Sequence, residues 1–184
     1  MGRYVALLRG INVGGNNLIK MKALAACFEA QGYESVVTYI QSGNVLFQAS
    51  ERTAAKLTEG IEAMLSTTFR YPASVVLLSK RQMRRVVEEA PKGFGADPEQ
   101  YRYDVLYLKP PLTAKAALAS VPVKAGVDRV DAGPGVLYFS RLVAKAAQSQ
   151  MSRVVSLPIY KNMTIRNWNT TAKLLDAMKR IQSP

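Results

Sequence analysis

Histidine is absent from this sequence of 184 residues, and Cys27 is its only cysteine. Together these absences exclude disulfide bonds within the chain, zinc fingers, Cys/His nucleophilic pairs, Ser-His-Asp triads and imidazole general bases. Cys27 lies in LAACFEA, on an expected amphipathic helix, where a cysteine usually packs as a small hydrophobe. We therefore expect no metal site, no bound cofactor and no cysteine nucleophile.

Long apolar runs and low-complexity tracts are also absent, so no segment has the length needed to span a membrane. The first residues, MGRYVALLRG, contain too short an apolar run for a secretory signal. Ala6 stands where a myristoylation signal requires Ser or Thr. The sequence therefore predicts a cytoplasmic protein without a membrane partner.

Acidic residues are scarce, with 13 Asp and Glu against 25 Lys and Arg, a net charge of +12. The segments 1–28, with four basic residues, and 141–175, with six, contain no acidic residue. If these segments meet in space, they form one cationic surface suited to an anionic partner. A basic surface that serves only solubility is an equally good interpretation.

Apolar periodicity in the first half predicts the order strand, helix, strand, strand, helix, strand. The strands are expected at 3–10, 35–41, 44–50 and 73–79, with a turn at Ser42, Gly43 and Asn44. One helix is expected at 21–31, and Ser50 is expected to cap the second. SKRQ, residues 79–82, is a capping-box pattern that predicts a further helix ending near Ala90.

The second half repeats most of this order, with strands at 103–109, 127–130 and 136–140 and helices at 113–120 and near 142–150. A last helix is expected within 167–181. The fold class predicted is α+β: two ferredoxin-like β-α-β-β-α-β halves packed together, the second incomplete, plus a C-terminal helix. We place the first subdomain at 1–90 and the second at 103–184.

Three stretches are richer in polar and turn-forming residues than their structural positions require: RGINVGGNN, TYIQSGNV and YKNMTIRNWNTT. None contains a carboxylate, so they supply hydrogen-bond donors suited to a phosphate or another anion. The spacing from Gly10 to Gly15 is that of a phosphate-binding loop. Asn16 and Asn17, however, replace its lysine and hydroxyl residue.

The candidate ligand-binding residues from these stretches are Arg9, Asn12, Gly14, Gly15, Ser42, Asn44, Arg166, Asn167 and Asn169. Each also has a structural interpretation: the glycines as turn residues, Ser42 and Asn44 as parts of a hairpin turn, and the last two asparagines as helix caps. Arg166 is the strongest candidate, because a helix dipole disfavours a cation at the N-terminus unless an anion is present.

A ferredoxin-like half with a basic end suggests an RNA-recognition module, which stacks bases on aromatic residues of its two central strands. In the first half, the first and third strands carry only Tyr4 and Phe47 as aromatic residues. The standard aromatic pattern of such modules is therefore absent from that sheet.

The segments ALLRGINVGG, TYIQSGNVLF and TIRNWNTTAKLL resemble, in order, the signature segments of the bacterial domain of unknown function 1697 family. The resemblance implies an α+β protein with ferredoxin-like parts and implies no activity. Region 51–135 is less typical of the family. The residues that fall on its motifs are Arg9, Gly10, Asn12, Gly14, Gly15, Gln41, Ser42, Gly43, Asn44, Arg166, Asn167, Trp168 and Asn169.

The leading functional hypothesis is a protein that binds an anionic ligand, either a nucleic acid or a phosphorylated, nucleotide-like small molecule. One alternative is a histidine-free enzyme acting on a small phosphorylated or carboxylated metabolite, with Lys20, Tyr39 or Ser42 as its reacting group. A second alternative makes the three stretches purely structural.

Overall fold

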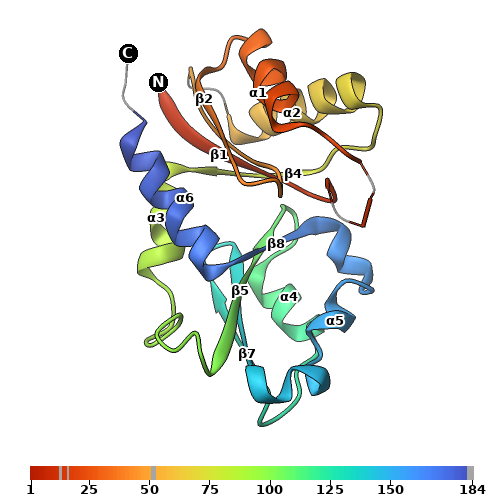
Figure 1. Ribbon diagram of the computed structural model, residues 1–184, viewed down its shortest axis with the longest axis vertical. Helices are drawn as coiled ribbons and strands as arrows, with labels where there is room; N and C mark the ends of the chain where they lie inside the picture. The colour runs from red at the N-terminus through yellow and green to blue at the C-terminus, as the bar shows by residue number, and fades with distance from the viewer. Residues whose placement is uncertain (13, 16, 51–52, 182–184) are drawn as a thin grey trace. The chain divides into compact units, whose positions relative to one another are not determined.

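The computed structural model describes residues 1–12, 14–15, 17–50 and 53–181 (Figure 1). Its chain divides into two compact units. The first unit holds Met1–Met83 together with the chain from Leu174 onward, and the second holds Arg84–Lys173. Each unit is built around its own four-stranded sheet.

The sheet of the first unit is antiparallel, with strand order β2-β3-β1-β4. Its chain order is β-α-β-β-α-β, as the sequence predicts. The elements are β1 (Gly2–Leu8), α1 (Met21–Ala30), β2 (Glu34–Tyr39), β3 (Asn44–Ala49), α2 (Ala54–Phe69) and β4 (Val75–Ser79).

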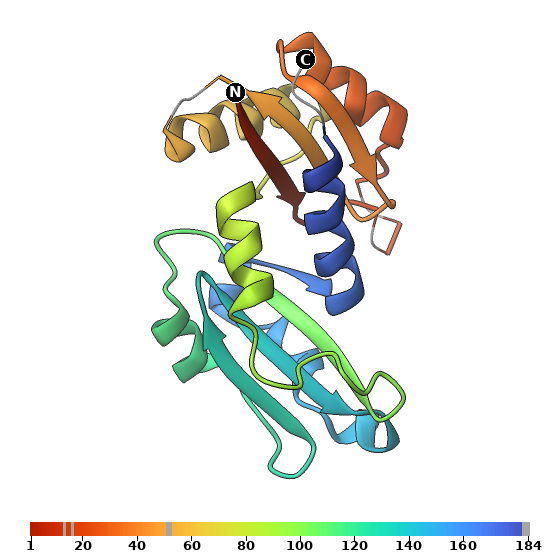
Figure 2. The same ribbon diagram turned by 90° about the vertical axis from the view of Figure 1, so that its left-hand side faces the viewer.

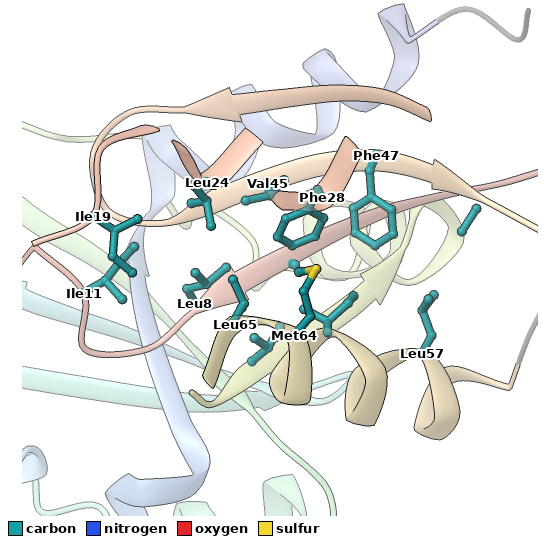
Figure 3. Close-up of a cluster of buried hydrophobic side chains, with 14 of the residues drawn as sticks. Leu8, Ile11, Ile19, Leu24, Phe28, Val45, Phe47, Leu57, Met64 and Leu65 are labelled. Carbon is teal, nitrogen blue, oxygen red and sulfur yellow. The ribbon is translucent and has the colours of Figure 1, made fainter. Parts of the chain in front are cut away.

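Helices α1 and α2 pack on one face of the sheet, where the main core lies (Figure 3). Phe28 of α1 lies against Phe47 of β3 with ring centroids 5.3 Å apart. Ile11 and Ile19, from the two ends of the loop between β1 and α1, are buried in the same cluster. The loop is therefore anchored to the core at both ends.

Two local features of this unit test the sequence patterns. Gly32 follows the last turn of α1 with φ of 79°, the left-handed conformation that glycine adopts without strain. The prediction that Ser50 caps α2 was wrong, because the N-cap is Thr53, whose hydroxyl accepts a hydrogen bond from the Lys56 amide at 3.4 Å. Apolar periodicity located the helix but did not fix its first residue.

The helix that follows β4 is α3 (Lys80–Glu88). Its predicted capping box is confirmed: the Ser79 amide donates to Gln82 Oε1 at 2.9 Å, and the Gln82 amide donates to Ser79 Oγ at 3.3 Å. Arg84 and Arg85 pair with Glu88 and Glu89 one turn later, as expected for a solvated helix face.

The second unit repeats the strand arrangement, with an antiparallel sheet of order β6-β7-β5-β8 (Figure 2). The fold class predicted from sequence is therefore confirmed. The elements are β5 (Tyr101–Leu108), α4 (Ala114–Ser120), β6 (Asp128–Gly133), β7 (Val136–Leu142), η1 (Val143–Gln148), α5 (Met151–Val154), η2 (Pro158–Asn162), β8 (Met163–Asn167) and α6 (Trp168–Arg180).

Two details of this half differ from expectation. The single helix expected near 142–150 was wrong: the chain forms η1 and then the short α5, with non-helical backbone at Lys145. The half is also complete rather than incomplete, because β8 pairs with β5 as a fourth strand. The sequence pattern does not predict this strand, because it is short and carries polar residues of the third motif.

The core of the second unit lies on the face of its sheet that α4 and α5 cover. Leu106 and Leu108 of β5 point to this face together with Leu137 and Phe139 of β7. In the part of the chain that the structure describes, no helix is long and apolar enough to cross a membrane.

Candidate functional site

The loop between β1 and α1 is held together by the side chain of Asn12. Its Nδ2 donates to the Ile19 carbonyl at 3.0 Å and to the Gln41 carbonyl at 2.9 Å. Its Oδ1 accepts from the Ile19 amide at 2.8 Å. Both amide hydrogens and the oxygen of this carboxamide therefore join the loop to itself and to the neighbouring turn, which brings the first two motif stretches together.

Two hydrogen bonds between Asn17 and the start of the loop hold its ends together. Asn17 Nδ2 donates to the Gly10 carbonyl at 2.8 Å, and the Asn12 amide donates to the Asn17 carbonyl at 3.2 Å. Positive φ angles occur at Gly10, Asn12, Gly14, Gly15 and Asn17. Glycine and asparagine are the residues that adopt this conformation most easily, which explains why the loop is made of them.

The tip of the loop presents Gly14 and Gly15, and both are exposed. Among the described residues other than its chain neighbours, none has an atom within 4 Å of the position that a Cβ on Gly15 would occupy, so these residues leave the backbone open to a ligand there. Arg9, half-buried at the end of β1, and the exposed Lys20 flank the loop. The phosphate-loop positions Asn16 and Val13 lie outside the described residues.

Asn44 occupies the predicted turn between β2 and β3 and is fully buried. Its Nδ2 donates to the Tyr39 carbonyl at 2.9 Å and to Ser42 Oγ at 3.0 Å. Gly43 has φ of 74°, and its carbonyl accepts from the Leu8 amide at 2.8 Å. Asn44 therefore shapes the turn, and Ser42 is the half-exposed side chain at its tip.

The third stretch belongs to the second unit, where Arg166 lies on β8. Its side chain is buried, and Nη1 donates to Thr164 Oγ1 at 2.9 Å and to the Ile165 carbonyl at 2.8 Å. Burial lowers the pKa of Arg166 to about 10, while the neighbouring Tyr107 and Tyr160 act in the opposite direction. Arg166 therefore remains a cation at neutral pH.

Asn167 begins α6 as its cap, because its Oδ1 accepts from the Thr170 amide at 2.7 Å. Trp168 packs edge-to-face on Phe94, with ring centroids 5.2 Å apart at 87°. Asn169 is exposed on the first turn of the helix. Asn167 therefore has the structural role of a helix cap, whereas the side-chain amide of Asn169 is exposed to solvent.

Comparison with protein families matches residues 1–138 to a model described as protein of unknown function (DUF1697). The chain belongs to the DUF1697 family. A comparison with curated proteins finds no match. Among solved structures, the conserved bacterial protein SP0830 from Streptococcus pneumoniae is similar at 26% identity, with a TM-score of 0.85 over 96% of this chain and 98% of that one.

The DUF1697 match includes the first two motif stretches, and the third lies beyond residue 138. Within the first unit the structure brings Asn12 and Gln41 into contact, whereas Arg166, Asn167 and Asn169 belong to the second unit. A ligand-binding role for the nine candidates stays a prediction. Among the described residues, no group of three or more Cys, Asp or Glu side chains is placed to hold a metal ion.

Sequence reasoning missed a pocket of about 390 Å³ in the second unit of this DUF1697 protein. Aromatic, cationic and acidic side chains line it, and none of the nine candidates does. The signal that could have found it is the even spacing of the tyrosines in QYRYDVLYL, which places Tyr101, Tyr103 and Tyr107 on one face of a strand.

Proposed function

We propose that this DUF1697 protein binds an anionic ligand, a nucleic acid or a nucleotide-like molecule, at its basic, Asn/Gly-rich segments. The observation that carries the proposal is the braced loop between β1 and α1. Asn12 and Asn17 hold the loop from within, and its exposed tip carries two glycines in the left-handed conformation. Such a loop is preorganised, so little conformational entropy is lost on binding.

Charge supports the same proposal. Residues 1–28 hold four basic and no acidic residues, so no carboxylate of this segment competes for an anion. In the proposed site the amides of Gly14 and Gly15 donate to a phosphate, with Arg9 and Lys20 as charge partners. Asn12 and Asn44 set the shape of the loop and turn, and Ser42 adds a hydroxyl.

The third stretch is assigned a parallel role in the second unit. Arg166 is a buried cation at neutral pH, and Asn169 is exposed on the first turn of α6. Desolvated cations bind anions more strongly than exposed ones do. We assign charge pairing with the ligand to Arg166 and orientation of the ligand to Asn169. Asn167, which caps α6, positions these two residues on either side of the helix start.

The test is a titration of short single-stranded RNA and DNA at about 50 mM and about 200 mM salt, monitored by anisotropy of the labelled oligomer. The double variant Arg9→Gln, Lys20→Gln is expected to bind at least about tenfold more weakly. If each cation makes one phosphate contact, the salt slope falls by roughly 1.4. Lys56→Gln, an exposed lysine of α2 in the same unit, is the matched control.

The nucleic-acid form of the proposal is wrong if the oligomers do not bind at low salt or bind without salt dependence. Inorganic pyrophosphate, used as a competitor, then tests the small-anion form. The proposal fails entirely if the double variant and Lys56→Gln bind every probe equally.

A second candidate, a purely structural role for the motifs, is favoured by the hydrogen bonds of Asn12, Asn44 and Asn167 within the chain. It predicts that Asn12→Ala and Asn44→Ala lower the melting temperature, while the Arg9 and Lys20 substitutions alter no binding. Thermal unfolding of all four single variants, measured beside the titration, separates the two candidates.

A further inference from the structure

The second sheet has two chemically different faces. Along β5, Leu106 and Leu108 point into the core beneath α4 and α5. Tyr101, Tyr103 and Tyr107 alternate with them and therefore point to the opposite face. Tyr138 of β7 lies on that same face, since it pairs with Val105 in the ladder. This tyrosine face belongs to β5 and β7, the two central strands of the sheet.

The chain between α3 and β5 crosses this face (Figure 2) and leaves the 390 Å³ pocket beside it. The lining includes Lys92 and Phe94 from that segment, Tyr101 and Tyr103 from β5, and Arg129 and Asp131 from β6. All of them lie within the second unit. The volume is within the range of about 300–1,000 Å³ common to small-molecule sites.

The aromatic wall of the pocket is fixed in place. Phe94 packs edge-to-face on Tyr103 at 4.9 Å and on Tyr138 at 5.3 Å. The Tyr103 hydroxyl accepts from the Asp97 amide at 3.3 Å, and the Tyr138 hydroxyl donates to the Val86 carbonyl at 2.6 Å. Tyr101 lies 6.0 Å from Tyr103 and is half-exposed. Tyr101 therefore offers a ring surface next to a rigid aromatic cluster.

The polar rim supplies both donors and acceptors. Arg129 Nε and Nη2 donate to the two oxygens of Asp131 at 2.9 and 3.3 Å. This pair is partly exposed, so a ligand with its own donors and acceptors can exchange with it at low cost. Lys92, another lining residue, is exposed and adds a cation.

We propose that this pocket binds a nucleobase, from a free nucleotide or from single-stranded RNA, with the base stacked on Tyr101 beside Phe94 and Tyr103. A base has the flat, apolar face that stacks on tyrosine and the polar edge that the Arg129 and Asp131 pair can satisfy. Lys92 then faces the attached phosphate. Ferredoxin-like sheets that bind RNA also carry their stacking residues on the two central strands.

This site does not depend on the proposed function, because none of its residues is among the nine motif candidates. The first unit lacks the equivalent aromatic face: Leu7 and Leu46 take the ladder positions that Tyr107 and Tyr138 occupy in the second.

The experiment titrates the whole protein with adenosine, AMP, ribose 5-phosphate and a short adenosine oligonucleotide. Binding is monitored by the fluorescence of Trp168, the single tryptophan, which packs on Phe94 at the pocket. Adenosine and AMP are expected to bind, and ribose 5-phosphate to bind at least about tenfold more weakly. Tyr101→Ala is expected to weaken adenosine binding by roughly 5- to 150-fold, the range for one stacked base.

Tyr101→Phe keeps the ring and is expected to restore binding. Lys115→Ala, an exposed lysine of α4, should change nothing. Arg129→Gln, a surface change with little effect on folding, should weaken AMP binding and provides a second test if Tyr101→Ala does not fold. If the oligonucleotide binds more tightly than AMP, RNA is the source of the base. If the two bind with equal affinity, the ligand is the free nucleotide.

The proposal is overturned if no base-containing probe binds, if ribose 5-phosphate binds as well as AMP, or if Tyr101→Ala and Arg129→Gln bind like the unmodified protein. The variants Arg9→Gln and Lys20→Gln should leave adenosine binding unchanged. A failure of the loop proposal and a failure of the pocket proposal are thus distinguishable.

Discussion

In the first unit the middle of the sheet face opposite α1 and α2 is aliphatic, flanked on β3 by Asn44 and Gln48. In the second unit the corresponding positions carry tyrosines and a cation. The ladders place Leu7, Leu46, Val76 and Leu78 where the second unit has Tyr107, Tyr138, Thr164 and Arg166. One strand order therefore supports two chemistries. Backbone topology sets the positions, and the side chains at those positions decide whether a face only packs or also offers polar groups.

Despite this difference, the helix-covered core faces of the two sheets should lose similar stability when a core phenylalanine is truncated. This is the largest effect that we expect. Phe47 and Phe139 are both fully buried on the helix-covered face of their sheets. Phe47→Ala and Phe139→Ala should each lower the free energy of unfolding by about 3–5 kcal/mol. Urea denaturation followed by circular dichroism measures both. Leu118→Ala, at a partly exposed site on α4, is the control, and a core loss near its value would contradict the assignment.

The aromatic cluster next to the pocket allows a sharper comparison between two glycines. Gly93 and Gly95 both have positive φ, but only a Cβ on Gly95 would collide with the ring of Trp168. Gly95→Ala should cost about 2–4 kcal/mol, and Gly93→Ala about 1–2 kcal/mol from the backbone alone. Thermal unfolding measures both, and Trp168 fluorescence should shift only in Gly95→Ala. Equal losses would show that the ring does not limit this position.

Two buried tyrosines, one from each unit, should respond in opposite directions to loss of the hydroxyl. The Tyr138 hydroxyl donates to Val86, whereas the buried Tyr71 hydroxyl has no hydrogen-bond partner among the described residues. Tyr138→Phe should therefore lose about 1 kcal/mol at neutral pH, and Tyr71→Phe should gain about 1 kcal/mol. Urea unfolding measures both free energies. Equal losses of stability in the two variants would contradict the expected difference between these tyrosines.

Alkaline pH should affect these two tyrosines in the same way. Burial raises the pKa of Tyr71 and of Tyr138 to about 12. The unfolded chain loses each proton near pH 10 while the folded chain keeps it, so stability falls as pH rises from about 10 toward 12. Each Phe variant removes one such contribution. Its unfolding free energy, measured at several pH values, should fall less steeply over that window than that of the unmodified protein.

The smallest effect expected is at the helix caps, where the two units match. Thr53 caps α2 and Thr113 caps α4, each accepting from the amide three residues later at 3.4 and 3.2 Å. Thr53→Ala and Thr113→Ala should each cost about 0.5–1 kcal/mol, and serine at either position should restore most of it. A differential scanning measurement on the four variants checks this. A cost of several kcal/mol at either cap would indicate a role beyond capping.

The order of elements was predictable because amphipathic periodicity and capping patterns are local. The segment LVAKAAQSQ shows where local information is insufficient. Its composition favours a helix, but the Gln150 amide donates to the Asp128 carboxylate at 2.8 Å, a contact from a strand 22 residues earlier. Helix propensity is a weak determinant that such tertiary contacts override.

In the candidate site, too, some features follow from local sequence and others depend on tertiary contacts. The glycines at positive φ could be predicted from their types, but the role of Asn12 depends on Gln41, which is 29 residues away and becomes a neighbour only on folding. Predicting the pocket from the sequence requires one further inference, namely that tyrosines spaced by two on a strand share one face of the sheet. Which residues cover that face depends on the chain between α3 and β5, whose path the sequence did not indicate.

The division of α6 between the two units bears on how the protein is made. Trp168–Lys173 belongs to the second unit, while the residues from Leu174 onward belong to the first, together with Met1–Met83. On the ribosome, residues 1–83 emerge well before Leu174 and Met178, which are buried in the finished protein. The first unit therefore cannot complete its core until the whole of the second unit has been synthesised.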